Sequence, residues 1–86
     1  MKFLQVIWDD DGQADGNVQH IAEHGLAMEE VEEVLEAAEE VVASDSSGRP
    51  LVFGHTSSGR YIAVVFDIVD EDPLVVYPVT AYEVEP

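Results

Sequence analysis

Three runs of β-forming residues follow one another in the second half of the chain, and only short turns separate them. The runs span residues 51–56, 61–69 and 74–82, with Ser57-Ser58-Gly59 and residues 70–73 as the turns. Connections this short join antiparallel neighbours, because a parallel pair needs a crossover of a dozen or more residues. The sequence therefore predicts an antiparallel meander, with the almost wholly apolar run 61–69 as its central strand.

Pro78 lies within the last of these three runs. A proline has no N–H to donate to a strand ladder, and within sheets it is confined to edges and bulges. We therefore expect Pro78 to lie at an edge position or at a β-bulge.

The first half of the chain begins with a β-rich run, residues 2–8, that ends in the acidic turn 9–12. Trp8 at the end of this run is expected to anchor the core. Helical patterns follow, so the element order is β-α-α-β-β-β. This order predicts an α+β fold in which two helices pack on one face of a mostly antiparallel sheet. A chain of 86 residues amounts to one domain, residues 1–86.

Two helices are expected between the first run and the meander. The first spans residues 17–24, with Asp15 as its cap and Gly25 as the left-handed residue after its end. The second spans residues 27–42. Apolar side chains recur along it at helical spacing, at Val31, Val34, Leu35, Ala38 and Val42. Glutamates occupy most of its other positions, which indicates an amphipathic helix with a strongly acidic outer face.

Acidic residues outnumber Lys and Arg by 19 to 3, which gives a formal net charge of −16. Phosphate backbones and anionic membranes repel such a chain, so generic binding to either is disfavoured. The chain has no cysteine for a disulfide or a thiolate metal site, and its first apolar run is too short for a signal segment or a membrane span. We expect a cytoplasmic protein, adapted to high salt or to a basic partner.

An ordered series of short motifs covers nearly the whole chain. In order, these are Trp8-Asp9, Asn17, His24-Gly25-Leu26, Glu29-Glu30, Arg49, Gly54, Gly59-Arg60, Val64-Val65-Phe66 and Val79-Thr80-Ala81-Tyr82-Glu83. The series resembles the BrnT family of toxins from type II toxin–antitoxin systems. The resemblance implies a RelE-like α+β fold, endoribonuclease activity without a metal or other cofactor, and an antitoxin partner of basic or ribbon-helix-helix character.

The resemblance and the side-chain chemistry together select five candidate site residues. Arg49 and Arg60 would bind a phosphate, His55 or His24 would transfer protons, and Tyr82 would position the substrate. If the second and third strands form a hairpin, both arginines and His55 are expected to share one face. The alternative for the arginines is an ion pair with a surface carboxylate, and the alternative for His24 and Tyr82 is packing.

The chain departs from the BrnT pattern where the family is cationic. Members carry Lys or Arg in the helix before the His-Gly pair and Arg in or after the last strand. The corresponding residues here are Val18, Gln19 and Glu23, then Val75-Val76-Tyr77-Pro78 and Tyr82. The first interpretation is a BrnT-like toxin-fold protein that acts as the ribonuclease of a type II toxin–antitoxin pair. The alternative is a non-catalytic acidic protein-interaction module on the same fold. A mimic of DNA and a homodimer are further alternatives.

The segment His20-Ile21-Ala22-Glu23-His24 matches H-x-x-E-H, a pattern in which two histidines one helical turn apart bind zinc. The helix is expected to end at once, at Gly25, and glutamate is too frequent in this chain for the match to be informative. We therefore expect no metal site and no cofactor.

Overall fold

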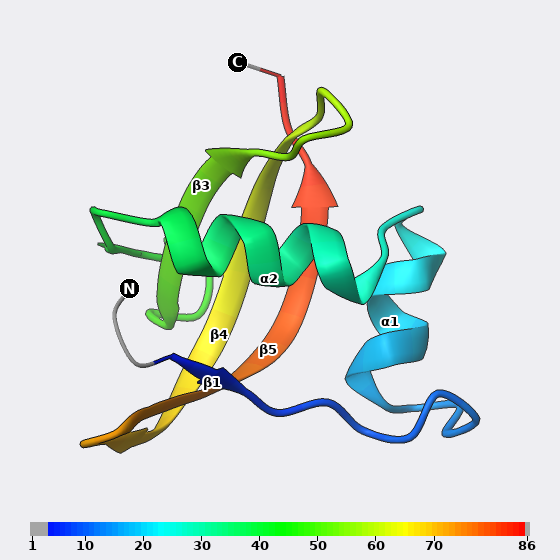
Figure 1. The fold of residues 1–86 in the computed structure, drawn as a ribbon, viewed down its shortest axis with the longest axis horizontal. Coiled ribbons are helices and arrows are strands. Elements are labelled where there is room, and N and C mark those ends of the chain that lie inside the picture. The colour runs from blue at the N-terminus through cyan, green and yellow to red at the C-terminus, as the bar shows by residue number, and fades with distance from the viewer. Residues whose placement is uncertain (1–3, 86) are drawn as a thin grey trace.

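In the computed structural model, which describes residues 4–85, two helices pack on a five-stranded, mostly antiparallel sheet (Figure 1). The elements are β1 (Gln5–Val6), α1 (Asn17–Glu23), α2 (Met28–Ala37), β2 (Val42–Ala43), β3 (Pro50–His55), β4 (Tyr61–Glu71) and β5 (Leu74–Glu83). The strand order is β1-β5-β4-β3-β2. The α+β class and the β3-β4-β5 meander are thus confirmed, and β4 is the middle strand as its apolar run predicts.

β1 is a parallel strand beside β5, with Gln5 opposite Val75 and Val6 opposite Val76. It is shorter than the predicted run 2–8, whose beginning, residues 2–3, lies outside the described residues. The parallel pairing is possible because both helices and the other strands lie between β1 and β5 in the chain. Trp8 packs against the main core, as predicted, and its indole N–H donates a hydrogen bond to Glu32 (3.0 Å).

The helix α1 begins at Asn17 as predicted, but its predicted cap and the predicted end of α2 are both wrong. Asp15 does not cap α1: the N-cap is Gly16, without a side-chain cap, and the Asn17 N–H is bound by the Asp9 carboxylate (2.9 Å). α2 ends at Ala37 and not at Val42, because Ala38 is already extended (φ −64°, ψ 131°). Carboxylates such as the one on Glu39 oppose the negative end of a helix, which favours this earlier end.

The missing last turn of α2 becomes a strand that the sequence did not predict. Val42 and Ala43 form β2, and Val42 pairs antiparallel with Leu51 of β3. The predicted bulge at Pro78 is confirmed. Pro78 pairs with Phe66 while Thr80 pairs with Val65, so the register shifts by one residue between them.

The two faces of the sheet differ. The helices cover one face and bury a core made of Ile21, Leu26, Val31, Val34, Leu35, Val52, Ile62, Val64, Phe66, Val76 and Ala81. Figure 1 shows α2 crossing in front of the meander. A close approach of α2 needs Gly54, because a Cβ there would lie 3.0 Å from a methyl of Val34. Neither helix within residues 4–85 has the length and apolar character that crossing a membrane requires.

The opposite face of the sheet carries a smaller cluster, which is made of Leu51, Ala63 and Val65, with Val84 packed against it. Beside this cluster Phe53 and Tyr82 keep 44% and 37% of their surface exposed. The helices therefore leave an apolar and aromatic part of the sheet in contact with solvent.

Candidate functional site

Both arginines already contact protein acceptors. The Nε of Arg49 lies 2.9 Å from a carboxylate oxygen of Asp67, and these side chains are 45% and 48% exposed. Arg60 donates a hydrogen bond to the carbonyl of Gly25 (2.5 Å), and its Nε lies 3.9 Å from Glu30. The predicted alternative of ion pairing therefore describes both residues in this structure.

The arginines also lie far apart. The predicted hairpin forms, with His55 opposite Tyr61, but Arg49 precedes β3 and Arg60 precedes β4. In an antiparallel pair this arrangement puts Arg60 at the turn and Arg49 at the other end of β3, about 20 Å away at a rise of about 3.3 Å per residue. His55 is beside Tyr61, with ring centroids 4.6 Å apart. The structure does not assemble the predicted clamp of two arginines and a histidine.

Three of the five predicted site residues do come together, at the C-terminal end of α1. The ring centroids of His24 and Tyr82 are 6.4 Å apart, and those of His20 and His24 are 5.6 Å apart. Arg60 joins them through its hydrogen bond to the carbonyl of Gly25, the residue after His24. We call His20, His24, Arg60 and Tyr82 the His24 corner. In the part of the chain that the structure describes, no group of three or more His, Asp or Glu side chains is placed to hold a metal ion.

The Arg60 side chain belongs to a junction between α2 and the β3–β4 turn. Glu30 accepts hydrogen bonds from the Ala27 N–H (3.1 Å) and from the Ser58 hydroxyl (2.9 Å), in addition to its contact with Arg60. Glu33 accepts the N–H of Ser57 at 2.7 Å. These bonds fasten the turn to the first turns of α2, so Arg60 helps to hold two elements together.

A polar cluster that the sequence did not reveal lies at the N-terminal end of α1. Asn17, only 2% exposed, accepts the Asp9 N–H and donates from its amide to the carbonyls of Ile7 and Pro78, all at 2.9–3.0 Å. Tyr77 donates its hydroxyl proton to the Asp9 carboxylate (2.5 Å). We call Asp9, Asn17 and Tyr77 the Asn17 cluster. It joins the chain after β1 to α1 and β5.

The ionisable groups of the Asn17 cluster are perturbed by their mutual hydrogen bond. It raises the pKa of Tyr77 to about 12, and burial and nearby carboxylates add to the rise. The bond from Tyr77, followed by the bond from the Asn17 backbone, lowers the pKa of Asp9. The Tyr77 hydroxyl therefore remains a donor to Asp9 at neutral pH. Two of the residues that carry the BrnT resemblance, Asp9 and Asn17, take part in hydrogen bonds that join elements of this fold.

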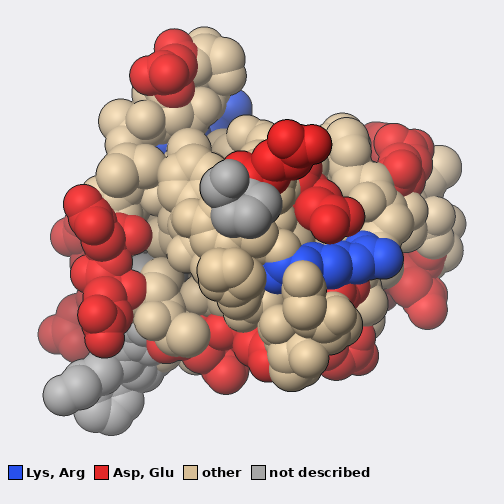
Figure 2. Space-filling model, turned by 90° about the horizontal axis from the view of Figure 1, so that it is seen from above, with Lys and Arg blue, Asp and Glu red and all other residues tan. Residues whose placement is uncertain are grey.

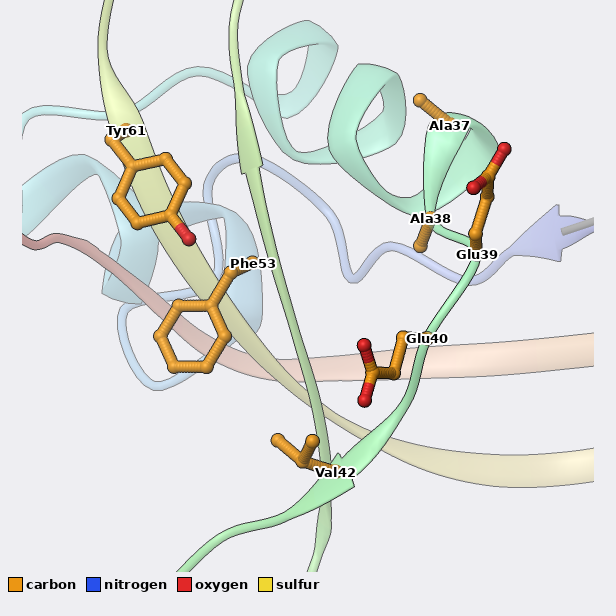
Figure 3. A pocket seen from close by; sticks show the side chains of 7 residues that line it. All are labelled: Ala37, Ala38, Glu39, Glu40, Val42, Phe53 and Tyr61. Atoms are coloured by element: carbon orange, nitrogen blue, oxygen red, sulfur yellow. The ribbon is translucent and has the colours of Figure 1, made fainter. Parts of the chain in front are cut away.

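A hollow of about 390 Å³ opens between the end of α2 and the edge of the sheet (Figure 3). It is lined by residues 37–40 together with Val42, Phe53 and Tyr61. The rings of Phe53 and Tyr61 are nearly parallel, with an angle of 11° and centroids 6.0 Å apart. We call this hollow the Phe53 pocket. The sequence did not predict it, because it exists only where α2 ends early and the chain bends into β2.

Comparison of this chain with protein-family models, with curated proteins and with solved structures finds no match. The α+β fold therefore rests on the structure alone, and the BrnT resemblance stays a prediction from the sequence.

Proposed function

We propose that this domain is a non-catalytic interaction module that binds a basic protein partner. The observation that supports the proposal most is that both arginines already bind acceptors within the protein. Arg49 pairs with Asp67, and Arg60 is bound by Gly25 and Glu30, so each cation of residues 4–85 already contacts an acceptor. A protein that binds a phosphate backbone needs several cations that are free to contact it.

The carboxylates, by contrast, are far in excess. The chain has 19 of them against 3 Lys and Arg residues. Figure 2 shows acidic side chains spread over the face in view, with few basic atoms among them. A surface of one sign steers an oppositely charged partner into contact and repels partners of its own sign.

The nature of the partner follows from the sequence resemblance. A BrnT-like chain would pair with a dedicated antitoxin of basic or ribbon-helix-helix character. The fold is of the α+β class that this resemblance implies. The departures from the pattern fall on the cationic positions, which supports binding without RNA cleavage.

The test is co-expression with the protein encoded by the adjacent reading frame. We expect a stable complex in size-exclusion chromatography, with an affinity that falls as salt rises, because screening weakens attraction between opposite charges. A neighbour that is acidic, or that elutes separately at low and at high salt, would contradict the proposal.

The His24 corner supports a second candidate, a metal-independent endoribonuclease. The rings of His24 and Tyr82 have their centroids 6.4 Å apart, and the Arg60 guanidinium contacts the carbonyl of Gly25, the residue after His24. An imidazole and a phenol are able to transfer protons at a ribose, and a guanidinium is able to bind a phosphate. Cleavage would require Arg60 to exchange its protein acceptors for a phosphate. RNA cleavage by the wild type in molar salt, lost in His24→Ala and in Tyr82→Phe, would establish this function in place of binding alone. Growth arrest on expression without the neighbour would support it.

A further inference from the structure

We infer that the Phe53 pocket binds an arginine side chain of a protein partner. The inference rests on the proposed function, since it names the place where a basic partner is recognised. Three features of the pocket support it: an exposed aromatic surface, apolar walls, and carboxylates without a hydrogen bond or ion pair to any of residues 4–85.

The aromatic surface comes from β3 and β4. Phe53 stacks on Tyr61, yet 44% of the Phe53 surface is exposed. A guanidinium packs well on an aromatic face, because the ring quadrupole attracts the cation and the two flat groups stack. The stacking on Tyr61 holds the Phe53 ring in place before a ligand arrives.

The walls suit the aliphatic part of an arginine. Ala37 and Ala38 lie on one side, and Val42, 39% exposed, lies on another. Long cationic side chains pack their methylene groups along apolar surface while the charged end stays polar. A short aliphatic wall beside an aromatic face therefore matches the shape of this side chain.

The carboxylates come from the segment that leaves α2. Glu39 and Glu40 both line the pocket, and neither has a hydrogen bond or ion pair to any described residue. Figure 3 shows the Glu40 carboxylate pointing toward Phe53. Among the described residues, Arg49 is paired with Asp67 and so does not neutralise these carboxylates. A guanidinium in the pocket would thus meet a carboxylate that is free to form charge-assisted hydrogen bonds.

The experiment is an NMR titration with the capped peptide acetyl-Gly-Gly-Arg-Gly-Gly-amide. The matched peptide carries citrulline in place of arginine and so has the same shape without the charge. We expect the arginine peptide to bind and the citrulline peptide to bind at least about 5-fold more weakly, since cation–π attraction and ion pairing both need the charge. Equal binding of the two peptides would overturn the inference.

Two variants locate the binding. Phe53→Leu keeps an apolar side chain but removes the ring, and we expect about 3- to 10-fold weaker binding. Glu40→Gln should weaken binding about 2- to 5-fold. Glu23→Gln is the control, because it removes the same charge from an exposed position on α1. An equal effect of Glu23→Gln and Glu40→Gln, or no effect of Phe53→Leu, would overturn the inference.

Further outcomes separate this inference from the proposed function. A complex with the basic neighbour that Phe53→Leu leaves intact would overturn the pocket alone, whereas the absence of any complex would remove the proposed function. Association of the protein with itself that Phe53→Leu abolishes would assign the pocket to a second copy, and so overturn the arginine ligand.

Discussion

The Asn17 cluster and the Phe53 pocket both contain aromatic and carboxylate groups, but these groups are hydrogen-bonded to the protein in the cluster and exposed in the pocket. In the Asn17 cluster a nearly buried amide contacts three backbone groups, and a tyrosine and a carboxylate bind each other. In the Phe53 pocket an aromatic face and two carboxylates line an exposed hollow, and neither carboxylate is bonded to another of residues 4–85. Satisfied polar groups stabilise the interior, because an unpaired buried group is costly. Unpaired groups at the surface are available to a ligand.

The largest effect should come from Asn17→Ala, which tests the structural side of this comparison. The change leaves the Asp9 N–H and the carbonyls of Ile7 and Pro78 without their partner in a buried place. We expect the free energy of unfolding to fall by about 3 kcal/mol, measured by urea denaturation. Gln13→Ala removes an exposed amide and should change stability by less than about 0.5 kcal/mol. Similar losses in the two variants would contradict the account.

A second prediction concerns the space around the Asn17 cluster. A Cβ at Gly16 would lie 2.7 Å from the Cβ of Asp9, whereas a Cβ at Gly12 would have nothing within 4 Å. We expect Gly16→Ala to cost about 1–3 kcal/mol through overpacking. Thermal unfolding of the two alanine variants compares them directly. Equal melting temperatures of Gly16→Ala and Gly12→Ala would contradict the close approach of Gly16 to Asp9.

Tyr77→Phe tests the hydrogen bond to Asp9 and its dependence on pH. At neutral pH we expect a loss of about 1 kcal/mol. Because the folded pKa of Tyr77 is raised from 10.0 to about 12, its contribution is complete below pH 10 and is lost as pH rises toward 12. Because the pKa of Asp9 is lowered from 3.8, its contribution is present above that pH and is lost on further acidification.

The difference in stability between wild type and Tyr77→Phe should therefore be constant from about pH 4 to pH 10 and shrink on both sides. Denaturation curves at several pH values measure it. A difference that grows above pH 10 would mean that Tyr77 ionises more easily in the folded protein than in the unfolded chain.

The smallest effects are expected at the arginines. Arg60→Ala loses a hydrogen bond to Gly25 and a contact with Glu30, and we expect a cost of about 1 kcal/mol. Arg49→Ala breaks an exposed ion pair and should cost less than about 0.5 kcal/mol. Denaturation in parallel checks the order of the two. Should Arg49→Ala leave stability unchanged but abolish an RNA-cleaving activity, the arginine would be a functional group and not a surface partner of Asp67.

The meander could be predicted from the sequence, because short turns and apolar runs restrict neighbouring strands to antiparallel pairs. The bulge at Pro78 followed from the missing N–H of proline. The end of α2 could not be predicted from periodicity, since Val42 continues the apolar spacing although the helix has stopped before it. Local charge at Glu39 and Glu40 and pairing of Val42 with Leu51 outweigh the helical pattern there.

The candidate site was predicted only in part, because tertiary packing and strand register decide which side chains meet. His24 and Tyr82 come together through tertiary packing of α1 on β5, while the hairpin register separates Arg49 from Arg60. Residue chemistry identifies which side chains are able to bind a phosphate, but the pairing register decides which of them meet. Asp9 and Asn17 contribute to the resemblance in sequence, but in this structure their hydrogen bonds join the segment after β1 to α1 and β5.

The most direct test of the account is a map of amide chemical-shift changes when the wild-type protein is titrated with the arginine peptide. If the arginine side chain binds in the Phe53 pocket, changes are concentrated at residues 37–42, Phe53 and Tyr61, with the Asn17 cluster unaffected. Changes centred on His24 and Tyr82, or spread evenly over the acidic surface, would contradict the account.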